Sequence, residues 1–114
     1  MDFNVGYQFV GWPPFSVEAA QAIVDEAQKC KGRPIKRKRG IGFEPNAVEI
    51  EYLRERGRRP GIGLSLYGGP ERYDNKLIKL GRTTAYSRAL IETRADLESI
   101  LPLISKAFGF KTGK

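Results

Sequence analysis

The chain has no histidine, and only one cysteine, one methionine and one tryptophan among its 114 residues. The missing histidine excludes Ser-His and Cys-His catalytic pairs and removes the most common metal ligand. Cys30, the lone cysteine, can form neither an internal disulfide nor a structural zinc site. These absences argue against an enzyme, and we expect no cofactor and no bound metal.

Long apolar runs are also missing. No stretch approaches the roughly 18 apolar residues of a membrane-spanning helix. The first residues, Met1 to Asn4, have no basic region of the kind that opens an export signal. Together with the single free thiol, this pattern predicts an intracellular, cytoplasmic protein that does not enter a membrane.

The chain does contain enough apolar material for one core. Hydrophobic residues make up 40% of the sequence, and the aromatic residues comprise six Phe, five Tyr and one Trp. A chain of this length and composition folds as one domain and does not stay disordered. We therefore predict a single domain over residues 1–114, with 111–114 as a frayed basic tail.

The net charge of +7 is unevenly spread along the chain. Residues 1–28 hold four acidic and no basic residues, whereas residues 29–59 hold eleven basic and four acidic residues. Residues 60–114 hold nine basic and five acidic residues, so the middle block alone equals the whole excess. Like charges packed this densely repel one another, and such a cluster predicts an anionic partner, most often nucleic acid.

Helices are predicted near both ends of the chain. The first spans about residues 17–30, with Ser16 as its N-cap and Gly32 beyond its end, and its apolar stripe comprises Val17, Ala20, Val24 and Ala27. The second follows Thr93 to Asp96, which is close to a capping box, and its stripe comprises Leu97, Ile100, Leu101, Ile104 and Phe108. Pro102 is expected to kink the second helix or delay its start, and Gly109 to cap its end.

Alternating apolar and polar residues predict strands at 4–10, 41–43, 47–54, 61–67 and 84–92. Residues 35–40 are predicted as a basic loop or strand entry, and 71–83 as an irregular excursion. Residues 47–54 also fit a helix from Asn46 to Arg56, but their β-branched and aromatic content favours a strand. The predicted fold is α+β, with a mostly antiparallel sheet of four to five strands and an N-terminal and a C-terminal helix packed on it.

Residues 35–110 resemble a group of small uncharacterised modules appended to restriction-type and predicted-transport proteins. In that group consecutive strands lead into a capped helix. The matching segments are Gly40–Phe43, Val48–Ile50, Gly61–Leu66 and Leu97–Ile104. The resemblance implies a two-layer α+β fold and an accessory role linked to nucleic acid, without catalytic residues to carry over.

Two basic clusters, Lys36–Arg39 and Arg56–Arg59, are the leading candidate binding site. If the strands between them are neighbours, both clusters can converge on one edge of the sheet. Four consecutive basic residues splay to both sides, which suits contact with phosphates better than base reading. The candidate residues, for DNA, RNA or an acidic protein surface, are Arg33, Lys36, Arg37, Lys38, Arg39, Arg54, Arg56, Arg58 and Arg59. The alternative is a solvated face with no specific role.

Three aromatic residues are candidates for stacking on bases: Trp12, Tyr67 and Tyr73. Trp12 lies in a stiff Gly-Trp-Pro-Pro turn, and the two tyrosines flank a glycine-rich turn. For all three, packing into the core is the favoured interpretation.

Other candidate chemistry has weaker support. Asp74-Asn75-Lys76, with Glu44 or Glu49 upstream, mimics the acidic-x-Lys element of a metal-dependent nuclease, but Asp74 is predicted to lie in a polar turn. If 47–54 is a strand, Glu49 and Glu51 share a face, either as paired carboxylates or as partners of Arg54 and Arg56. The basic neighbours of Cys30 could lower its thiol pKa, yet without a base partner a spectator thiol is favoured.

The sequence thus favours a non-enzymatic domain that binds nucleic acid by gripping phosphates. The alternative is a small inhibitor or adaptor of phage or mobile-element type that docks onto a larger protein or nucleoprotein machine. A metal-dependent nuclease is the remote alternative. An unpaired strand edge would also permit a homodimer.

Overall fold

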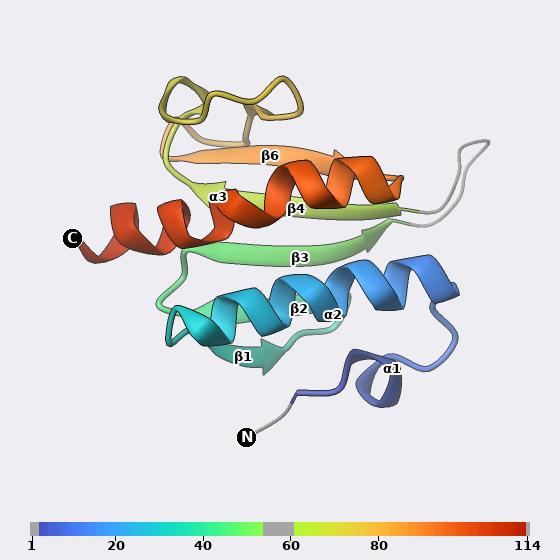
Figure 1. The fold of residues 1–114 in the computed structure, drawn as a ribbon. Helices are drawn as coiled ribbons and strands as arrows, with labels where there is room; N and C mark the ends of the chain where they lie inside the picture. Colours follow the sequence, from blue (N-terminus) through green and yellow to red (C-terminus); the bar gives the residue numbers. More distant parts are fainter. Residues whose placement is uncertain (1–2, 54–60, 114) are drawn as a thin grey trace.

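The computed structural model describes residues 3–53 and 61–113. Six antiparallel strands form one sheet in the order β1-β2-β3-β4-β6-β5, and two long helices cover one of its faces (Figure 1). In chain order the elements are α1 (Val5–Gln8), α2 (Pro14–Lys29), β1 (Arg33–Lys36), β2 (Gly40–Glu44), β3 (Val48–Leu53), β4 (Gly61–Tyr67), the 3₁₀ turn η1 (Pro70–Arg72), β5 (Lys79–Leu80), β6 (Tyr86–Ile91) and α3 (Arg94–Thr112). The predicted α+β architecture is confirmed.

The prediction of a strand at residues 4–10 is wrong, because this segment contains the helix α1. The Asn4 side chain accepts a hydrogen bond from the Tyr7 backbone N–H and so caps the helix. Val5 and Phe9 are both buried, while Tyr7 is 80% exposed. Apolar residues four apart fit one side of a helix as well as one face of a strand, and here the cap decides between them.

The first long helix, α2, begins earlier than the sequence predicted. Pro14 is its first residue, where proline is tolerated because that N–H needs no partner inside the helix. The predicted N-cap is therefore wrong: Ser16 lies inside the first turn, buried, and its hydroxyl has no hydrogen-bond partner. The buried face comprises Ser16, Ala19, Ala20, Ile23, Val24 and Ala27, which leaves Val17 half-buried.

The predicted strands at 41–43, 47–54, 61–67 and 84–92 correspond to β2, β3, β4 and β6, and the helical alternative for 47–54 is wrong. Their inward residues alternate as predicted, and they include Val48, Ile50, Ile62, Leu64, Leu66, Ala89 and Ile91. The sheet has six strands, more than predicted, because β1 and the two-residue β5 also pair at its edges. Gly40 is required where β2 meets β3, since a Cβ there would overlap the Ile50 carbonyl oxygen.

The second long helix, α3, starts at the predicted capping box. The Thr93 hydroxyl accepts from the Asp96 N–H at 3.1 Å, and the Asp96 carboxylate accepts from the Thr93 N–H at 3.2 Å. The helix begins at Arg94 and continues through Pro102, which lies on the exposed side where water can satisfy the carbonyl that loses its donor. The predicted delayed start is wrong.

The C-terminal boundary also differs from the prediction. Gly109 lies inside α3, and the capping glycine is Gly113, whose φ of 77° is in the left-handed region that favours glycine. Lys111 and Thr112, predicted as part of a frayed tail, belong to the last turn of the helix.

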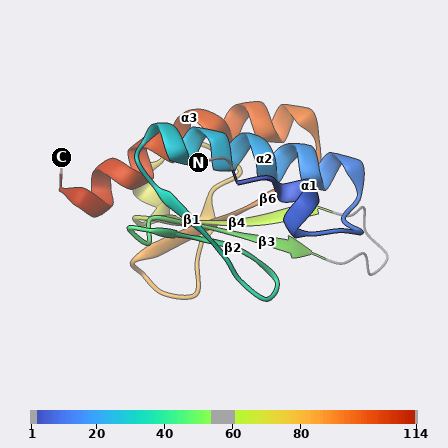
Figure 2. The ribbon, with the colours of Figure 1, turned by 90° about the horizontal axis from the view of Figure 1, so that it is seen from below.

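Both helices pack on the same face of the sheet, so the opposite face carries no helix in residues 3–53 and 61–113 (Figure 2). The core forms between the two layers, from residues such as Ile23 of α2 and Ile100 and Ile104 of α3. Phe43 of β2 meets Phe108 of α3 edge to face, with ring centroids 6.2 Å apart. The uncovered side of the sheet is called the open face below.

Candidate nucleic-acid interface

The β1–β2 hairpin carries the basic run that the sequence singled out. Lys36 lies on the helix side, with its Nζ 5.6 Å from the centroid of the Phe9 ring. Arg37 lies on the open face, where its guanidinium covers Gly42. Lys38 and Arg39 are exposed in the turn. The run splays to both sides of the sheet, as expected, and only the hairpin cluster, Arg37 to Arg39, belongs with the open face.

The other predicted basic residues divide into two groups. Arg33 lies on β1 and forms an ion pair with Glu44, its cross-strand partner on β2. Arg54, Arg56, Arg58 and Arg59 lie outside the described residues, so their convergence with the hairpin cluster remains a prediction. The register places the turn after β1 at the sheet end where β3 finishes and β4 begins, because Gly40 pairs with Glu51.

Small residues and carboxylates form the floor of the open face. The outward positions of β2 and β4 include Gly40, Gly42, Gly61, Gly63 and Ser65. Between these strands, Glu49 and Glu51 of β3 are exposed and point to the same side, since their neighbours Val48 and Ile50 are buried. The predicted shared face of Glu49 and Glu51 is therefore confirmed. Gly40, Gly42 and Gly61 are buried, and the side chains of Arg37 and Leu53 lie over Gly42 and Gly63, so the two carboxylates are the groups of this floor that a ligand can reach.

A second basic group, which the sequence analysis did not select, lies at the other edge of the sheet. Arg88 of β6 is exposed between buried Ser87 and Ala89, and its cross-strand partner on β5 is Lys79. Arg82 is exposed in the turn between these strands. The alternation of residues 84–92 places Arg88 on the outward face, but a two-residue β5 has no pattern that would reveal Lys79. Lys79, Arg82 and Arg88 are called the β6 cluster below.

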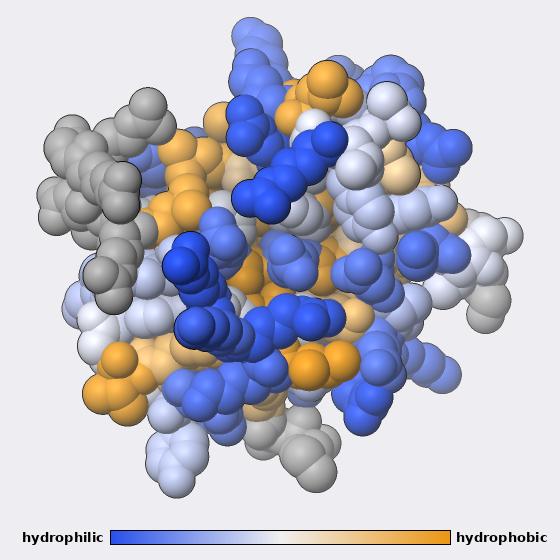
Figure 3. Space-filling view, turned by 180° about the vertical axis from the view of Figure 1, so that it is seen from behind, coloured by the Kyte–Doolittle hydropathy of each residue, from blue (hydrophilic) through white to orange (hydrophobic). Residues whose placement is uncertain are grey.

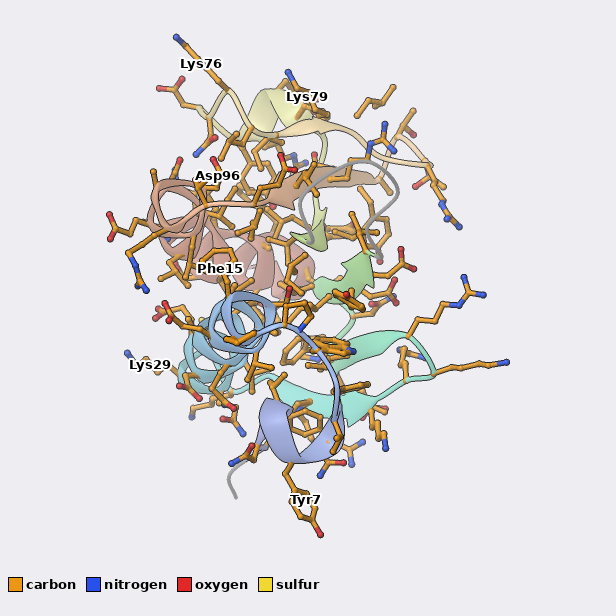
Figure 4. All side chains as sticks on the ribbon, turned by 90° about the vertical axis from the view of Figure 1, so that its right-hand side faces the viewer. Tyr7, Phe15, Lys29, Lys76, Lys79 and Asp96 are labelled. Carbon is orange, nitrogen blue, oxygen red and sulfur yellow. The ribbon has the colours of Figure 1, made fainter. Side chains whose placement is uncertain are left out.

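The turn that holds the hairpin cluster and the turn that holds Arg82 project to the same side of the sheet. Seen along the sheet in Figure 2, the β1–β2 turn and the turn before β6 both extend away from the helices. Figure 4 shows the same arrangement from the side, with Lys29 on the helix layer and Lys79 at the far edge of the sheet. Viewed directly in Figure 3, this face carries many strongly hydrophilic side chains, with hydrophobic patches showing between them. The open face thus has a basic cluster near each of its two edges.

The hairpin cluster forms one wall of a shallow depression of about 240 Å³ in this face. Its lining comprises Arg37, Lys38, Arg39, Gly40, Glu49, Ile50 and Glu51. The Arg37 Nε lies 3.8 Å from the Glu49 carboxylate, and both side chains are about half exposed. The depression therefore presents cations and carboxylates side by side.

The charge is segregated between the two layers of the fold. Helices α2 and α3 together hold four basic and five acidic residues. Residues 33–53 and 61–93, which form the sheet and its connections, hold ten basic and six acidic residues. Acidic residues of α2 are also engaged within the helix layer: Glu18 pairs with Arg94, and Glu26 lies 3.6 Å from Lys29. Among the described residues, the excess of basic residues thus belongs to the sheet and its connections, whereas the two long helices hold one more acidic than basic residue.

The three stacking candidates serve mainly in packing. The Trp12 ring lies 4.5 Å from Phe9 and 5.1 Å from Tyr52, between centroids, as a lid on the core. Tyr73 is 4% exposed and donates its hydroxyl hydrogen to the Tyr67 carbonyl, and burial raises its pKa to about 12. Tyr67 is half-buried, with the Lys111 Nζ 4.5 Å from its ring centroid.

The residues of the nuclease hypothesis do not come together. Asp74 and Lys76 belong to the excursion before β5, where the Asn75 side chain donates to the Ser99 hydroxyl of α3 at 2.7 Å. Glu44 and Glu49 lie on the open face on β2 and β3, and both β4 and β6 lie between these strands and β5. Among residues 3–53 and 61–113, no group of three Cys, Asp or Glu residues is placed to hold a metal ion.

The remaining candidate, Cys30, is partly buried just after α2. The expectation of a lowered thiol pKa is wrong. Burial raises the pKa of this thiol, and the nearby Glu26 carboxylate raises it further. A protonated thiol is a poor nucleophile, which agrees with a spectator role.

Comparisons with protein-family models, curated proteins and solved structures found no match. Within the described part of the chain, no helix combines the length and the apolar character needed to cross a bilayer. The interpretation of the open face therefore rests on its own geometry and charge.

Proposed function

We propose that this chain is a non-enzymatic nucleic-acid-binding domain that holds the phosphate backbone on the open face of its sheet. The observation that carries the proposal is the pair of basic rims, the hairpin cluster and the β6 cluster. The turns that hold Arg37–Arg39 and Arg82 extend away from the helices (Figure 2), and Arg88 lies on the outward side of β6 beside Lys79. Each Lys or Arg that reaches a phosphate releases condensed counterions, and this release drives binding that does not depend on sequence.

The dimensions of the sheet suit a ligand that lies across the strands. Six strands at a spacing of about 4.8 Å place the two edges roughly 24 Å apart. Nucleic acid with a rise of about 3.4 Å per nucleotide covers that width in about seven nucleotides. Because the rims are this far apart, only a ligand of at least that length can contact both clusters at once.

The chemistry of the floor favours backbone contact over base stacking. The outward residues of β2 and β4 are mostly glycines, together with Glu44, Ser65 and the half-buried Tyr67 at the end of β4, and those of β3 include two carboxylates. Two of the three stacking candidates, Trp12 and Tyr73, are packed against other residues. Such a surface has no aromatic platform at its centre on which bases would stack, so its contacts with phosphates would come from the basic residues at its edges.

Fluorescence anisotropy with a labelled duplex of about 14 base pairs, twice the length that spans the sheet, tests the proposal. We expect the affinity to fall by orders of magnitude between about 50 and 200 mM salt. The double variant Lys38→Ala/Arg39→Ala should weaken binding and reduce the slope of log K against log salt by about 1.8, at about 0.9 per phosphate contact. The variant Lys79→Ala/Arg88→Ala should do the same from the other rim.

The matched control removes two lysines from the helix layer, as Lys29→Ala/Lys106→Ala. This variant has the same net charge as the two rim variants, so it separates a local effect from a general loss of positive charge. We expect it to bind nearly as well as the wild type. Absence of binding by the wild type at 50 mM salt, or equal losses in all three variants, would overturn the proposal.

A protein partner is the second candidate, and the exposed carboxylates favour it. Glu49 and Glu51 repel phosphates but suit a partner surface that carries its own lysines or arginines. In this reading the chain is a small inhibitor or adaptor that docks onto a larger machine through the same face. Recovery of the tagged chain from cells, with and without nuclease treatment, distinguishes the two. One stoichiometric protein that survives digestion supports the adaptor, and loss of all partners on digestion supports nucleic-acid binding.

A further inference from the structure

The contact between Arg37 and Glu49 spans a whole strand. Arg37 follows β1, Glu49 lies on β3, and β2 runs between them. The guanidinium can cross β2 only because Gly42 has no side chain, since a Cβ at that position would collide with the Arg37 Nε. Arg37 therefore lies flat against the open face and does not extend into solvent like its neighbours in the turn.

We propose that Arg37 is a phosphate-binding residue whose guanidinium is paired with the Glu49 carboxylate in the absence of ligand. The carboxylate then occupies the position that a ligand phosphate would take. A carboxylate and a phosphate oxygen offer a guanidinium the same charge-assisted hydrogen bonds. This inference rests on the proposed function and adds a competitor within the site. Binding of a phosphodiester at Arg37 requires exchange of one anion for the other, and the released Glu49 then stands on the floor as an unpaired charge.

The geometry indicates that replacing the Glu49 carboxylate by a phosphate at Arg37 costs little free energy. The Arg37 Nε and the Glu49 oxygen are 3.8 Å apart, which exceeds an ordinary hydrogen-bond length, and each side chain is about half exposed. Exposed pairs of this kind contribute little to stability, and a stronger anion can displace the carboxylate. Glu49 thus lowers the affinity of the site for nucleic acid without preventing binding.

Two substitutions release Arg37 by different physical routes. Glu49→Gln removes the competing charge, whereas Gly42→Ala places a methyl group where the guanidinium lies. For Glu49→Gln we expect binding of the labelled duplex to tighten roughly two- to fivefold, the range set by one surface ion pair. The salt slope should steepen by up to about 0.9, since one more phosphate contact forms. Gly42→Ala should shift affinity in the same direction while leaving the net charge unchanged.

The double variant Arg37→Ala/Glu49→Gln separates this mechanism from a general loss of negative charge. If Glu49 acts through Arg37, the gain from Glu49→Gln disappears when it is introduced into Arg37→Ala. A gain that persists there, or an equal gain in the control Glu98→Gln on the exposed side of α3, overturns the inference. If the wild type fails to bind the duplex at all, the proposed function itself has failed, and this outcome is distinct from binding that Glu49→Gln leaves unchanged.

Discussion

The buried hydroxyl of Ser16 gives a prediction whose size follows from the structure. The Ser16 side chain is 1% exposed at the start of α2, and its oxygen has no hydrogen-bond partner. Burying an unsatisfied hydroxyl costs about 1–3 kcal/mol. Alanine is in addition the better helix former, by about 0.5 kcal/mol. Because loss of the oxygen leaves a small void that offsets part of this gain, we expect Ser16→Ala to raise the free energy of unfolding by about 1–2 kcal/mol.

Denaturant titration followed by circular dichroism measures this change, and the melting temperature should rise by about 4–8 °C. Ser105→Ala in α3 is the control, since that serine is exposed. Its hydroxyl donates a long hydrogen bond of 3.3 Å to the Pro102 carbonyl, which water can replace, so we expect a change within about 0.5 kcal/mol. If Ser16→Ala lowers stability by 1 kcal/mol or more, the hydroxyl has a partner in the folded protein. The assignment of Ser16 to the buried face of α2, without a capping role, would then be refuted.

Three further predictions concern the close contact of Gly40 with β3, the buried phenol of Tyr73 and the thiol of Cys30. Gly40→Ala should destabilise the fold by several kcal/mol or prevent folding, because its Cβ would overlap a carbonyl oxygen of β3; thermal melting measures this loss. The pKa of Tyr73 is about 12 in the folded protein and about 10 in the unfolded chain. The un-ionised phenol therefore contributes its full stabilisation below pH 10, and this contribution to the free energy of unfolding is lost as the pH rises toward 12. Unfolding titrations of wild type and Tyr73→Phe should therefore converge in that interval. Cys30 should react with iodoacetamide at pH 8 more slowly than free cysteine, because its thiol pKa is raised.

Each of these predictions has a contradicting result. A stable, normally folded Gly40→Ala would show that β2 and β3 are paired differently. Parallel stability curves for wild type and Tyr73→Phe above pH 10 would mean that the phenol ionises freely in the folded state. Alkylation of Cys30 faster than the free amino acid would show an activated thiol.

Secondary structure was predicted best from the sequence where one face of a helix or strand is buried and the other is exposed to solvent. Strict alternation located β3, β4 and β6 and the outward face that Glu49 and Glu51 share. It failed at residues 4–10, because Val5 and Phe9 satisfy a strand and a helix equally and only the Asn4 cap separates them. The ends of helices were harder to predict than the helices themselves. Gly109 and Gly113 offer the same local signal for a helix end, and packing of Phe108 and Phe110 against neighbouring rings continues α3 past the first glycine.

The candidate site was only partly accessible to sequence reasoning. The basic run Lys36–Arg39 could be recognised from the sequence, but the division of its side chains between the two faces of the sheet depends on the pairing of β1 with β2. Lys79 could not be found, since a two-residue strand has no periodicity and its position beside Arg88 is a product of the register. The ion pair of Arg37 was also hidden, because its partner lies two strands away and the contact depends on the absence of a side chain at Gly42.

The measurement that tests the central claim most directly is a map of backbone amide shifts on titration with the duplex. If the open face binds phosphates, the amide signals of the hairpin cluster and the β6 cluster should move together and saturate at one ligand concentration. Signals from the outer side of α2, including Glu18 and Asp25, should stay in place. Shifts confined to the helix layer, or no shifts at low salt, would contradict the account.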